Sequence, residues 1–309
     1  MNRERFGLIY FSMLIILFSP CTLVAQNKKC SSPVHEVIST YNTMVRMRDG
    51  VGLATHIYRP KDVGRYPALI VRNPYSNGTD TTSIKEGRWW ASRGYVYILQ
   101  NARGRYNSEG NNYPYIFEIN DGYDTQQWAG TQPGPNGKIG TLGGSYLATV
   151  QWMAAPLRSP YLKAMAPAVS PFNYYHDVMY RGGAFSLASR IGWGAAMGGR
   201  TNLQIRHDFA SHMTHLPLIT MDKVLGLDLP HWRDWIEHPM YDAYWQTLDV
   251  EAKVPEIDVP SLNIGGWFDV FQRGTLTSFM KMKTSGRTEQ AREGQRLIMG
   301  PWPHGINRS

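Results

Sequence analysis

Apolar, strand-like runs alternate with helical segments along most of this 309-residue sequence, and this alternation limits the possible fold more than any other feature. Two such runs, YPALIVRNPY (66–75) and GYVYILQNARG (94–104), flank the helical candidate TTSIKEGRWWASRG. The later runs are KIGTL, LKAMAPAV, VPSLNIGGWFD and QRLIMGPWPH. Apolar strands that alternate with helices are typical of a largely parallel sheet. The sequence therefore predicts an α/β fold.

Three stretches depart from this pattern. The first, NTMVRMRDGVGLATHIYRP, predicts two extended runs joined at Asp49-Gly50, a strong hairpin signal. Residues 107–130 are acidic and rich in turn formers, so no regular element is predicted there. In residues 172–254, helical segments rich in Trp, Met and His replace the strand-like runs. We therefore expect an α/β core, residues 31–171 and 255–309, interrupted by a helical cap at 172–254.

The first 25 residues have the organisation of a secretory signal peptide. Arg3 and Arg5 precede the apolar run GLIYFSMLIILF, and Ala25 follows it at a suitable cleavage point. A membrane anchor is the alternative, but about 12 apolar residues are short for a bilayer span. We expect an exported protein, periplasmic or secreted, with no stable membrane anchor. Removal of residues 1–25 would leave Cys30 as the only thiol, so no intramolecular disulfide is expected.

The net charge of +8 raises the question of a nucleic-acid or membrane-surface function. The Lys and Arg residues are dispersed, and they do not interleave with aromatic residues in a recognisable nucleic-acid-binding module. No nucleic-acid partner is therefore predicted.

A serine, Ser145, stands in GKIGTLGGSYLATVQWMAA where a predicted strand gives way to a predicted helix. In α/β-hydrolases the nucleophile lies on such a turn, and small neighbours are needed because the backbone approaches itself closely. Gly143 meets this need, but Leu147 occupies the last position of the G-x-S-x-G pattern. Taken alone, the stretch is also explained by a tight structural turn.

Two further residues favour a catalytic serine. Asp269 ends the predicted strand in NIGGWFD, and His304 follows the strand in LIMGPWPH. The chain order Ser145, Asp269, His304 is that of the α/β-hydrolase triad, with each residue near the C-terminal end of a strand. In a triad the histidine takes the serine proton, and the aspartate holds the imidazole in the required tautomer. This chemistry requires no cofactor.

Three histidines in HDFASHMTH, at positions 207, 212 and 215, raise the question of a metal site. Their spacing does not place all three on one helical face, and no H-E-x-x-H pattern accompanies them. We expect a solvated helix and no metal.

The segments GTLGGSYLA, GGWFDVF, GPWPH, VRNPY and NARGRYNSEG together resemble the cocaine-esterase and X-prolyl dipeptidyl-peptidase family, the CocE/NonD hydrolases, over about residues 38–309. The resemblance implies an oxyanion hole made by the Tyr75 hydroxyl and the backbone N–H of Tyr146. It also implies that NARGRYNSEG is a structural loop, with Arg103 and Glu109 as ion-pair or hydrogen-bond partners.

Family members continue into a jelly-roll β-sandwich beyond the point at which this sequence stops. On that basis the sequence looks truncated, and we expect the loop that carries His304 to be held poorly.

The substrate pocket follows from the same resemblance. Relatives that hydrolyse α-amino acid esters hold the substrate ammonium group with acidic residues two and three positions after the triad aspartate, where this chain has Phe271 and Gln272. The resemblance therefore favours an aromatic acyl pocket formed by Phe271 and Trp193, although Trp193 is equally explained as a core residue of the cap. Asp177 is the one acidic residue that could still bind an ammonium group.

These expectations together describe a serine hydrolase with an α/β-hydrolase core and a helical cap. Its partners would be small-molecule esters, or short peptides, with small or aromatic acyl groups, cleaved through an acyl-enzyme. One alternative is an X-Pro dipeptidyl-peptidase or α-amino acid ester hydrolase, for which only Asp177 offers an anion. An alternative of another class is a non-catalytic relative that acts as a binding protein, which would be free to lose the triad residues that this chain retains.

Overall fold

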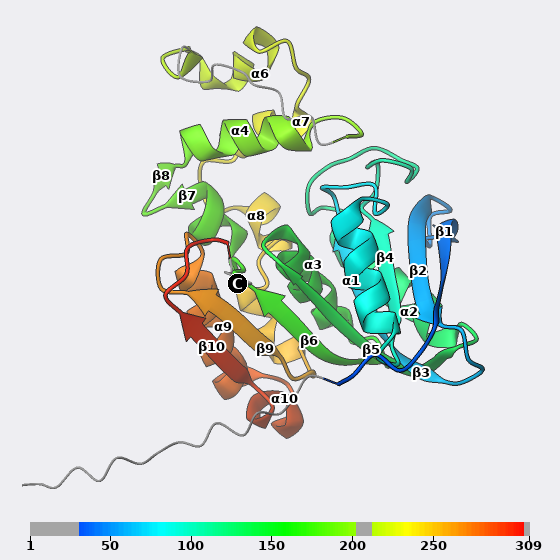
Figure 1. Cartoon of the computed structure of the whole chain (residues 1–309). Helices are drawn as coiled ribbons and strands as arrows, with labels where there is room; N and C mark the ends of the chain where they lie inside the picture. The colour runs from blue at the N-terminus through cyan, green and yellow to red at the C-terminus, as the bar shows by residue number, and fades with distance from the viewer. Residues whose placement is uncertain (1–30, 202–211, 306–309) are drawn as a thin grey trace, which may run out of the picture. The chain divides into compact units, whose positions relative to one another are not determined.

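The computed structural model describes residues 31–201 and 212–305, so the predicted signal peptide lies outside the described residues. The chain divides into units 1–32 and 33–309, and the second contains an eight-stranded sheet of order β1-β2-β4-β3-β5-β6-β9-β10 (Figure 1). Its strands are β1 Val37–Arg46, β2 Gly52–Pro60, β3 Tyr66–Asn73, β4 Val96–Asn101, β5 Pro135–Gly144, β6 Leu162–Ala168, β9 Leu262–Gly266 and β10 Arg296–Gly300.

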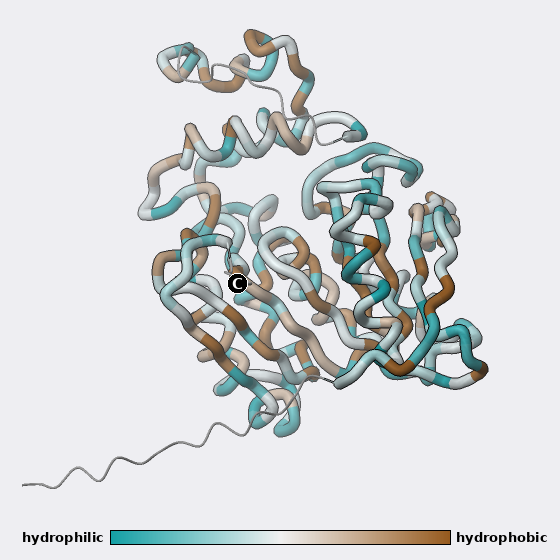
Figure 2. The backbone as a smooth tube through the Cα atoms, viewed as in Figure 1, coloured by the Kyte–Doolittle hydropathy of each residue, from teal (hydrophilic) through white to brown (hydrophobic). Residues whose placement is uncertain are grey.

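The sheet is parallel from β4 to β10, whereas β2 is antiparallel to both of its neighbours. All six residues of β4 are buried, because a central strand in a sheet of this kind is covered on both faces. Hydrophobic residues accordingly concentrate on the strands, and hydrophilic residues concentrate in the outer loops (Figure 2). The predicted α/β-hydrolase fold is confirmed.

The hairpin predicted at Asp49-Gly50 is also present, since β1 and β2 pair with Arg46 opposite Gly52. The turn needs a glycine, because Gly50 has a φ of +85°, a conformation that side chains disfavour. The hairpin supplies one antiparallel edge of the sheet.

Helices pack on both faces of the sheet. Helix α1 packs on β4 and β2, whereas α2 and α3 pack on each other and on β5, and α9 packs on β9. In Figure 1, α1 lies in front of the sheet and α9 behind it. The Asp80 side chain caps α1 by accepting hydrogen bonds from the Thr82 and Ser83 N–H groups. The bounds are α1 Thr81–Ala91, α2 Glu118–Thr131, α3 Tyr146–Ala154, α9 Gln272–Ser285 and α10 Glu289–Glu293, with a 3-10 turn at Ala155–Leu157.

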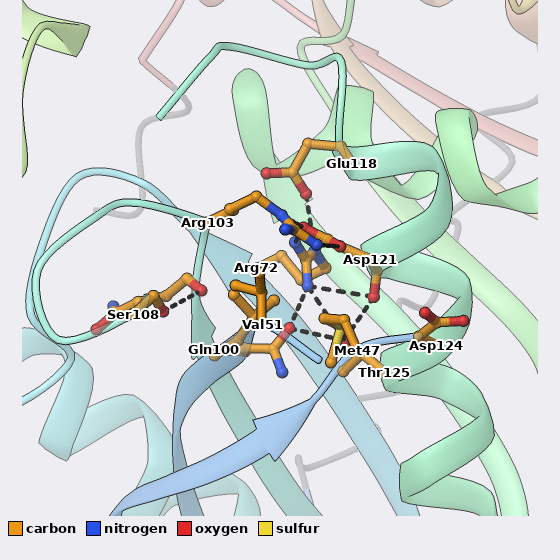
Figure 3. A network of polar contacts seen from close by, with 12 residues as sticks. Met47, Val51, Arg72, Gln100, Arg103, Ser108, Glu118, Asp121, Asp124 and Thr125 are labelled. Atoms are coloured by element: carbon orange, nitrogen blue, oxygen red, sulfur yellow. Dashed lines mark hydrogen bonds and ion pairs between the residues drawn. The ribbon is translucent and has the colours of Figure 1, made fainter. Parts of the chain in front are cut away.

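Helix α2 corrects the expectation of an irregular stretch at residues 107–130. Arg72 Nε donates to Glu118 Oε2 over 2.8 Å, and Arg103 donates to both oxygens of Asp121 over 2.9 and 2.6 Å (Figure 3). The buried side chains of α2 are mostly polar: Glu118, Asp121, Thr125 and Gln126. Buried ion pairs therefore hold this helix instead of an apolar stripe, so hydrophobic periodicity gave no signal for it.

The NARGRYNSEG loop forms the ion pairs expected of it. Arg103 also pairs with Asp49 over 2.7 Å, and Glu109 pairs with Arg46 over 2.7 Å. Hydrogen bonds and charge from Asp121 and Asp49 raise the pKa of Arg103. The loop thus fastens the β1–β2 hairpin to α2.

Between β6 and β9 the chain forms mainly short helical segments, with one small hairpin that was not predicted. Aromatic residues of this segment, among them Tyr175, Trp232 and Trp245, belong to the same buried hydrophobic cluster as Ile70 and Ile139 of the sheet. The elements are a π-helical turn Tyr175–Met179, β7 Tyr180–Arg181, β8 Ala184–Phe185, α4 Leu187–Met197, a 3-10 turn Leu218–Thr220, α6 Met221–Val224, α7 Pro230–Glu237, α8 Ala243–Thr247 and a 3-10 segment Glu251–Glu256.

Candidate active site

Ser145 lies on the sharp turn between β5 and α3 and has φ 60° and ψ −121°. This conformation is strained for a residue with a side chain, and such strain is typical of a nucleophile turn. A Cβ added to Gly143 would lie 2.5 Å from the Cβ of Leu147, so the turn requires glycine there. The turn therefore has the geometry expected of a nucleophile, with the serine at the carboxyl end of a central strand.

The structure brings Ser145, His304 and Asp269 together. His304 Nε2 lies 2.9 Å from Ser145 Oγ, and His304 Nδ1 lies 2.7 Å from Asp269 Oδ1. The Asp269 side chain has no exposed surface, whereas 39% of the His304 side chain is exposed. A buried carboxylate can therefore orient an imidazole that remains open toward a substrate.

The loops that carry Asp269 and His304 are fastened to each other, because they follow the neighbouring parallel strands β9 and β10. Trp267 N–H donates to Gly300 O over 2.9 Å, and Phe268 N–H donates to Trp302 O over 3.1 Å. These bonds and the side-chain contacts of His304 join the two loops, and the expectation that the His304 loop is held poorly stays a prediction.

The predicted oxyanion donors lie beside the serine. The Trp193 indole N–H donates to Tyr75 Oη over 3.2 Å, which leaves the Tyr75 O–H as the group that can donate. Burial raises the pKa of the Tyr75 phenol, while hydrogen bonds with Trp193 and Ser145 offset part of the rise, so the phenol stays protonated at neutral pH. Tyr146 begins α3, and the first N–H of a helix has no acceptor within the helix.

The predicted aromatic residues contact this group of residues. The Phe271 ring makes a T-shaped contact with the His304 ring, with centroids 5.1 Å apart. Trp193 stacks on Tyr115 at 5.8 Å, and Tyr115 stacks on Tyr146 at 4.4 Å. Tyr115 was not predicted, because it lies in an irregular loop without a motif.

A pocket of about 520 Å³ opens at Ser145 and His304. Most of its other lining residues are small or apolar, and they include Val71, Leu142 and Ile264 of three strands. An apolar pocket with a few polar groups is the usual form of a small-molecule site.

Asp177 does not offer the free charge that an ammonium group would need. Its Oδ2 accepts from the backbone N–H groups of Phe172 and Asn173 over 2.8 and 2.9 Å, and Arg273 donates to its Oδ1. The carboxylate is thus neutralised by Arg273, a partner 96 positions away in the sequence.

Of the three histidines in HDFASHMTH, His207 lies outside the described residues, and His215 hydrogen-bonds Thr220 Oγ1 at 2.8 Å. Within residues 31–201 and 212–305, no three His, Cys, Asp or Glu residues are grouped in a way that could hold a metal ion.

The same described part of the chain contains no helix with the length and apolar character needed to cross a membrane.

The sequence matches the family model described as X-Pro dipeptidyl-peptidase (S15 family) over residues 49–306. The chain belongs to this family. Among S15-related proteins, it is 32% identical to the cocaine esterase of Rhodococcus sp. (strain MB1 Bresler), over 85% of this chain and 48% of that protein. The family resemblance inferred from the motifs is therefore confirmed.

Two solved structures share the fold of this S15-family chain. An alpha-amino acid ester hydrolase superposes with a TM-score of 0.70 at 25% identity, over 93% of this chain and 52% of the other. A CocE/NonD family hydrolase from Staphylococcus aureus superposes with a TM-score of 0.65 at 25% identity, over 86% and 46%. The chain thus spans about half the length of these relatives.

Proposed function

We propose that this protein is a serine hydrolase that cleaves carboxylic esters, and also amides, of small or aromatic acyl groups through an acyl-enzyme. The observation that carries the proposal is the pair of hydrogen bonds that His304 makes with Ser145 and Asp269, at 2.9 and 2.7 Å, with Ser145 on a strained strand-to-helix turn. The similarity to cocaine esterase supports an ester as the substrate.

The reaction begins when Ser145 Oγ attacks the ester carbonyl carbon while His304 Nε2 takes the hydroxyl proton. Asp269 accepts the Nδ1–H bond and stabilises the imidazolium that forms. Collapse of the tetrahedral intermediate expels the alcohol, which takes the proton from Nε2 and leaves the acyl group on Ser145. Water then repeats the same steps and releases the acid.

The oxyanion of each intermediate would lie between the Tyr75 hydroxyl and the Tyr146 backbone N–H. Both donors are fixed before the reaction, one by the Trp193 indole and the other by the start of α3. Donors fixed in advance stabilise developing charge without reorganisation, which makes them effective in a pocket with little water.

A fluorophosphonate probe and a series of 4-nitrophenyl esters would test the proposal on the full-length gene product. We expect covalent labelling and hydrolysis in the parent protein, and neither in Ser145→Ala. Labelling that persists in Ser145→Ala would refute the assignment, and a parent protein without either signal would favour the binding-protein alternative.

The dipeptidyl-peptidase alternative is disfavoured by the partners of Asp177. Release of X-Pro dipeptides needs an anion for the free N-terminus of the peptide, and Asp177 is engaged by Arg273 and two backbone N–H groups. Hydrolysis of Ala-Pro-4-nitroanilide at a rate comparable with that of simple esters would favour the dipeptidyl-peptidase alternative over the esterase.

Export is part of the proposal and rests on the sequence of residues 1–25. Cell fractionation, together with N-terminal sequencing of the mature protein, would test it. A protein that retains Met1 in the cytoplasmic fraction would contradict export.

A further inference from the structure

Two arginines beside the candidate active site have no acidic partner. Arg181 ends β7, and Arg190 lies in α4. Among the described residues, neither guanidinium has a carboxylate oxygen within 4.0 Å. Arg181 Nε donates to the backbone carbonyl of Asp177 over 2.8 Å, and Arg190 Nε donates to Ser189 Oγ over 3.2 Å. Both cations are held in place by neutral groups, and their charge is not balanced by a paired acid.

Each arginine stands over an aromatic residue that contacts the catalytic group. Arg181 Cζ lies 5.6 Å from the centroid of Phe271, whose ring meets that of His304. Arg181 and Phe271 also line a second pocket, of about 330 Å³. The two residues thus place a cation one side chain away from His304.

Arg190 lies close to the predicted oxyanion donor Tyr75, again through an aromatic residue. Arg190 Cζ lies 5.9 Å from the centroid of Trp193, whose indole N–H bonds the Tyr75 hydroxyl. The positive charge of Arg190 also acts to lower the pKa of Tyr75, against the larger effect of burial. Arg190 is therefore one side chain away from the Tyr75 hydroxyl.

The nearby carboxylates are already engaged. Asp269 bonds His304, Asp177 bonds Arg273, and Glu251 pairs with Lys281 over 2.9 Å. Burial and then the like charge of Arg190 lower the pKa of Arg181. The charges of Asp177 and Asp269 act on Arg181 in the opposite sense and offset part of this effect, whereas Arg190 has no carboxylate within 4.0 Å among the described residues.

We propose that the preferred substrates are esters whose acyl group carries a carboxylate, which Arg181 and Arg190 bind. This inference rests on the proposed ester hydrolysis and specifies its substrate class. A guanidinium matches a carboxylate through two parallel hydrogen bonds, so arginine suits this task better than lysine. The aromatic rings would contact the methylene chain between the carboxylate and the ester.

A matched pair of substrates tests the idea. Mono-4-nitrophenyl glutarate carries the carboxylate, and methyl 4-nitrophenyl glutarate is its neutral counterpart with the same chain and leaving group. We expect the parent protein to hydrolyse the anionic ester with a kcat/KM at least tenfold higher, and we expect this ratio to fall as salt is added, because salt screens exposed charges.

Substitution separates recognition from chemistry. Arg181→Gln and Arg190→Gln should each lower the ratio of kcat/KM for the anionic ester to kcat/KM for the neutral ester about tenfold or more, while Arg181→Lys should retain part of the preference. Arg287→Gln is the matched control, because Arg287 follows α9 at the other end of the sheet. Equal kcat/KM for the two esters in the parent, or an unchanged ratio in both glutamine variants, would overturn the inference.

Binding measured without turnover keeps this inference separate from the proposed chemistry. In Ser145→Ala, calorimetry should show tighter binding of the anionic ester than of the neutral one, and the difference should disappear when Arg181→Gln is added. An equal affinity for both esters would refute anion recognition. A clear preference in a protein that hydrolyses neither ester would support anion recognition while refuting the esterase assignment.

Discussion

The Tyr146 hydroxyl donates a hydrogen bond to Glu118 Oε1 over 3.1 Å, and Arg72 donates to the other oxygen of the same carboxylate over 2.8 Å. Tyr146 immediately follows Ser145, so the start of α3 is tied to a buried ion-pair network between β3 and α2 (Figure 3). The side chain of Tyr146 packs in the core, and its backbone N–H is one of the two predicted oxyanion donors. Under the proposed mechanism, one residue would contribute to both stability and catalysis.

Glu118→Gln should destabilise the protein, because it leaves the buried Arg72 charge with only the more distant Asp121 as an acidic partner. Removing one member of a buried ion pair costs about 3 kcal/mol of unfolding free energy. Urea unfolding measures the change. Glu36→Gln, which removes the exposed pair between Glu36 and Lys61, serves as the control and should leave the midpoint unchanged. Equal midpoints for the two variants would contradict the structural role of Glu118.

Ser145→Ala, Asp269→Asn and His304→Ala should each abolish nearly all ester hydrolysis, and their losses should not add. Triad members act as a unit, so a double variant is no slower than the slower single variant. Steady-state kinetics on a 4-nitrophenyl ester checks this. Multiplicative losses in Ser145→Ala/His304→Ala would show that the two residues act independently.

Tyr75→Phe should lower kcat about a hundredfold and change KM little, because it removes one oxyanion donor and preserves the ring. The variant keeps the aromatic contact of Tyr75 with Tyr146, whose ring centroids are 6.0 Å apart. A parallel measurement on Tyr95→Phe, outside the site, controls for loss of a phenol elsewhere. An unchanged kcat in Tyr75→Phe would remove this residue from the oxyanion site.

Gly266→Ala should reduce kcat about a hundredfold while the sheet still folds. An added Cβ would lie 2.0 Å from Trp302 O, so the loop that carries His304 must move. Misplacing a catalytic group by about 1 Å can cost a hundredfold in rate. Circular dichroism and ester kinetics on the same sample separate a loss of folding from a loss of activity. A folded variant with full activity would show that the close approach of Gly266 to Trp302 O is not required.

Stability should fall as the pH is lowered from 6.5 toward 4, in part through His231. Burial lowers the pKa of His231 from 6.5 to about 4, and its ring Nε2 bonds Gly194 O at 3.1 Å. Between these values the unfolded chain binds more protons than the folded one, so unfolding becomes easier by up to about 3 kcal/mol. His231→Gln should flatten the pH dependence of the unfolding midpoint, and an unchanged dependence would contradict the role of His231.

The sequence was informative where one local pattern decides the structure. Alternating apolar runs predicted the sheet, Asp49-Gly50 predicted the hairpin, and chain order predicted which serine, aspartate and histidine would meet. Residues whose distant partners belong to no motif were not predictable in this way. Helix α2 depends on Arg72 and Arg103 for its buried charges, and the engagement of Asp177 depends on Arg273.

The same distinction explains why the arginines were missed. Arg181 and Arg190 belong to no motif, and their proposed role rests on the lack of a carboxylate within 4.0 Å of either among the described residues. A sequence shows which charges a chain has, whereas only a structure shows which of them are balanced.

The hydrogen bond between Ser145 and His304 joins residues 159 positions apart. Such a contact can form only after the intervening chain, which includes the sheet strands β6, β9 and β10 and the inserted helices, has been placed. Contacts between distant residues form slowly in folding, because the entropy of a long loop must be lost first. Hydrolytic competence should therefore return last when the denatured protein is refolded, after secondary structure and compactness have recovered, and the serine would be chemically silent in every incompletely folded molecule.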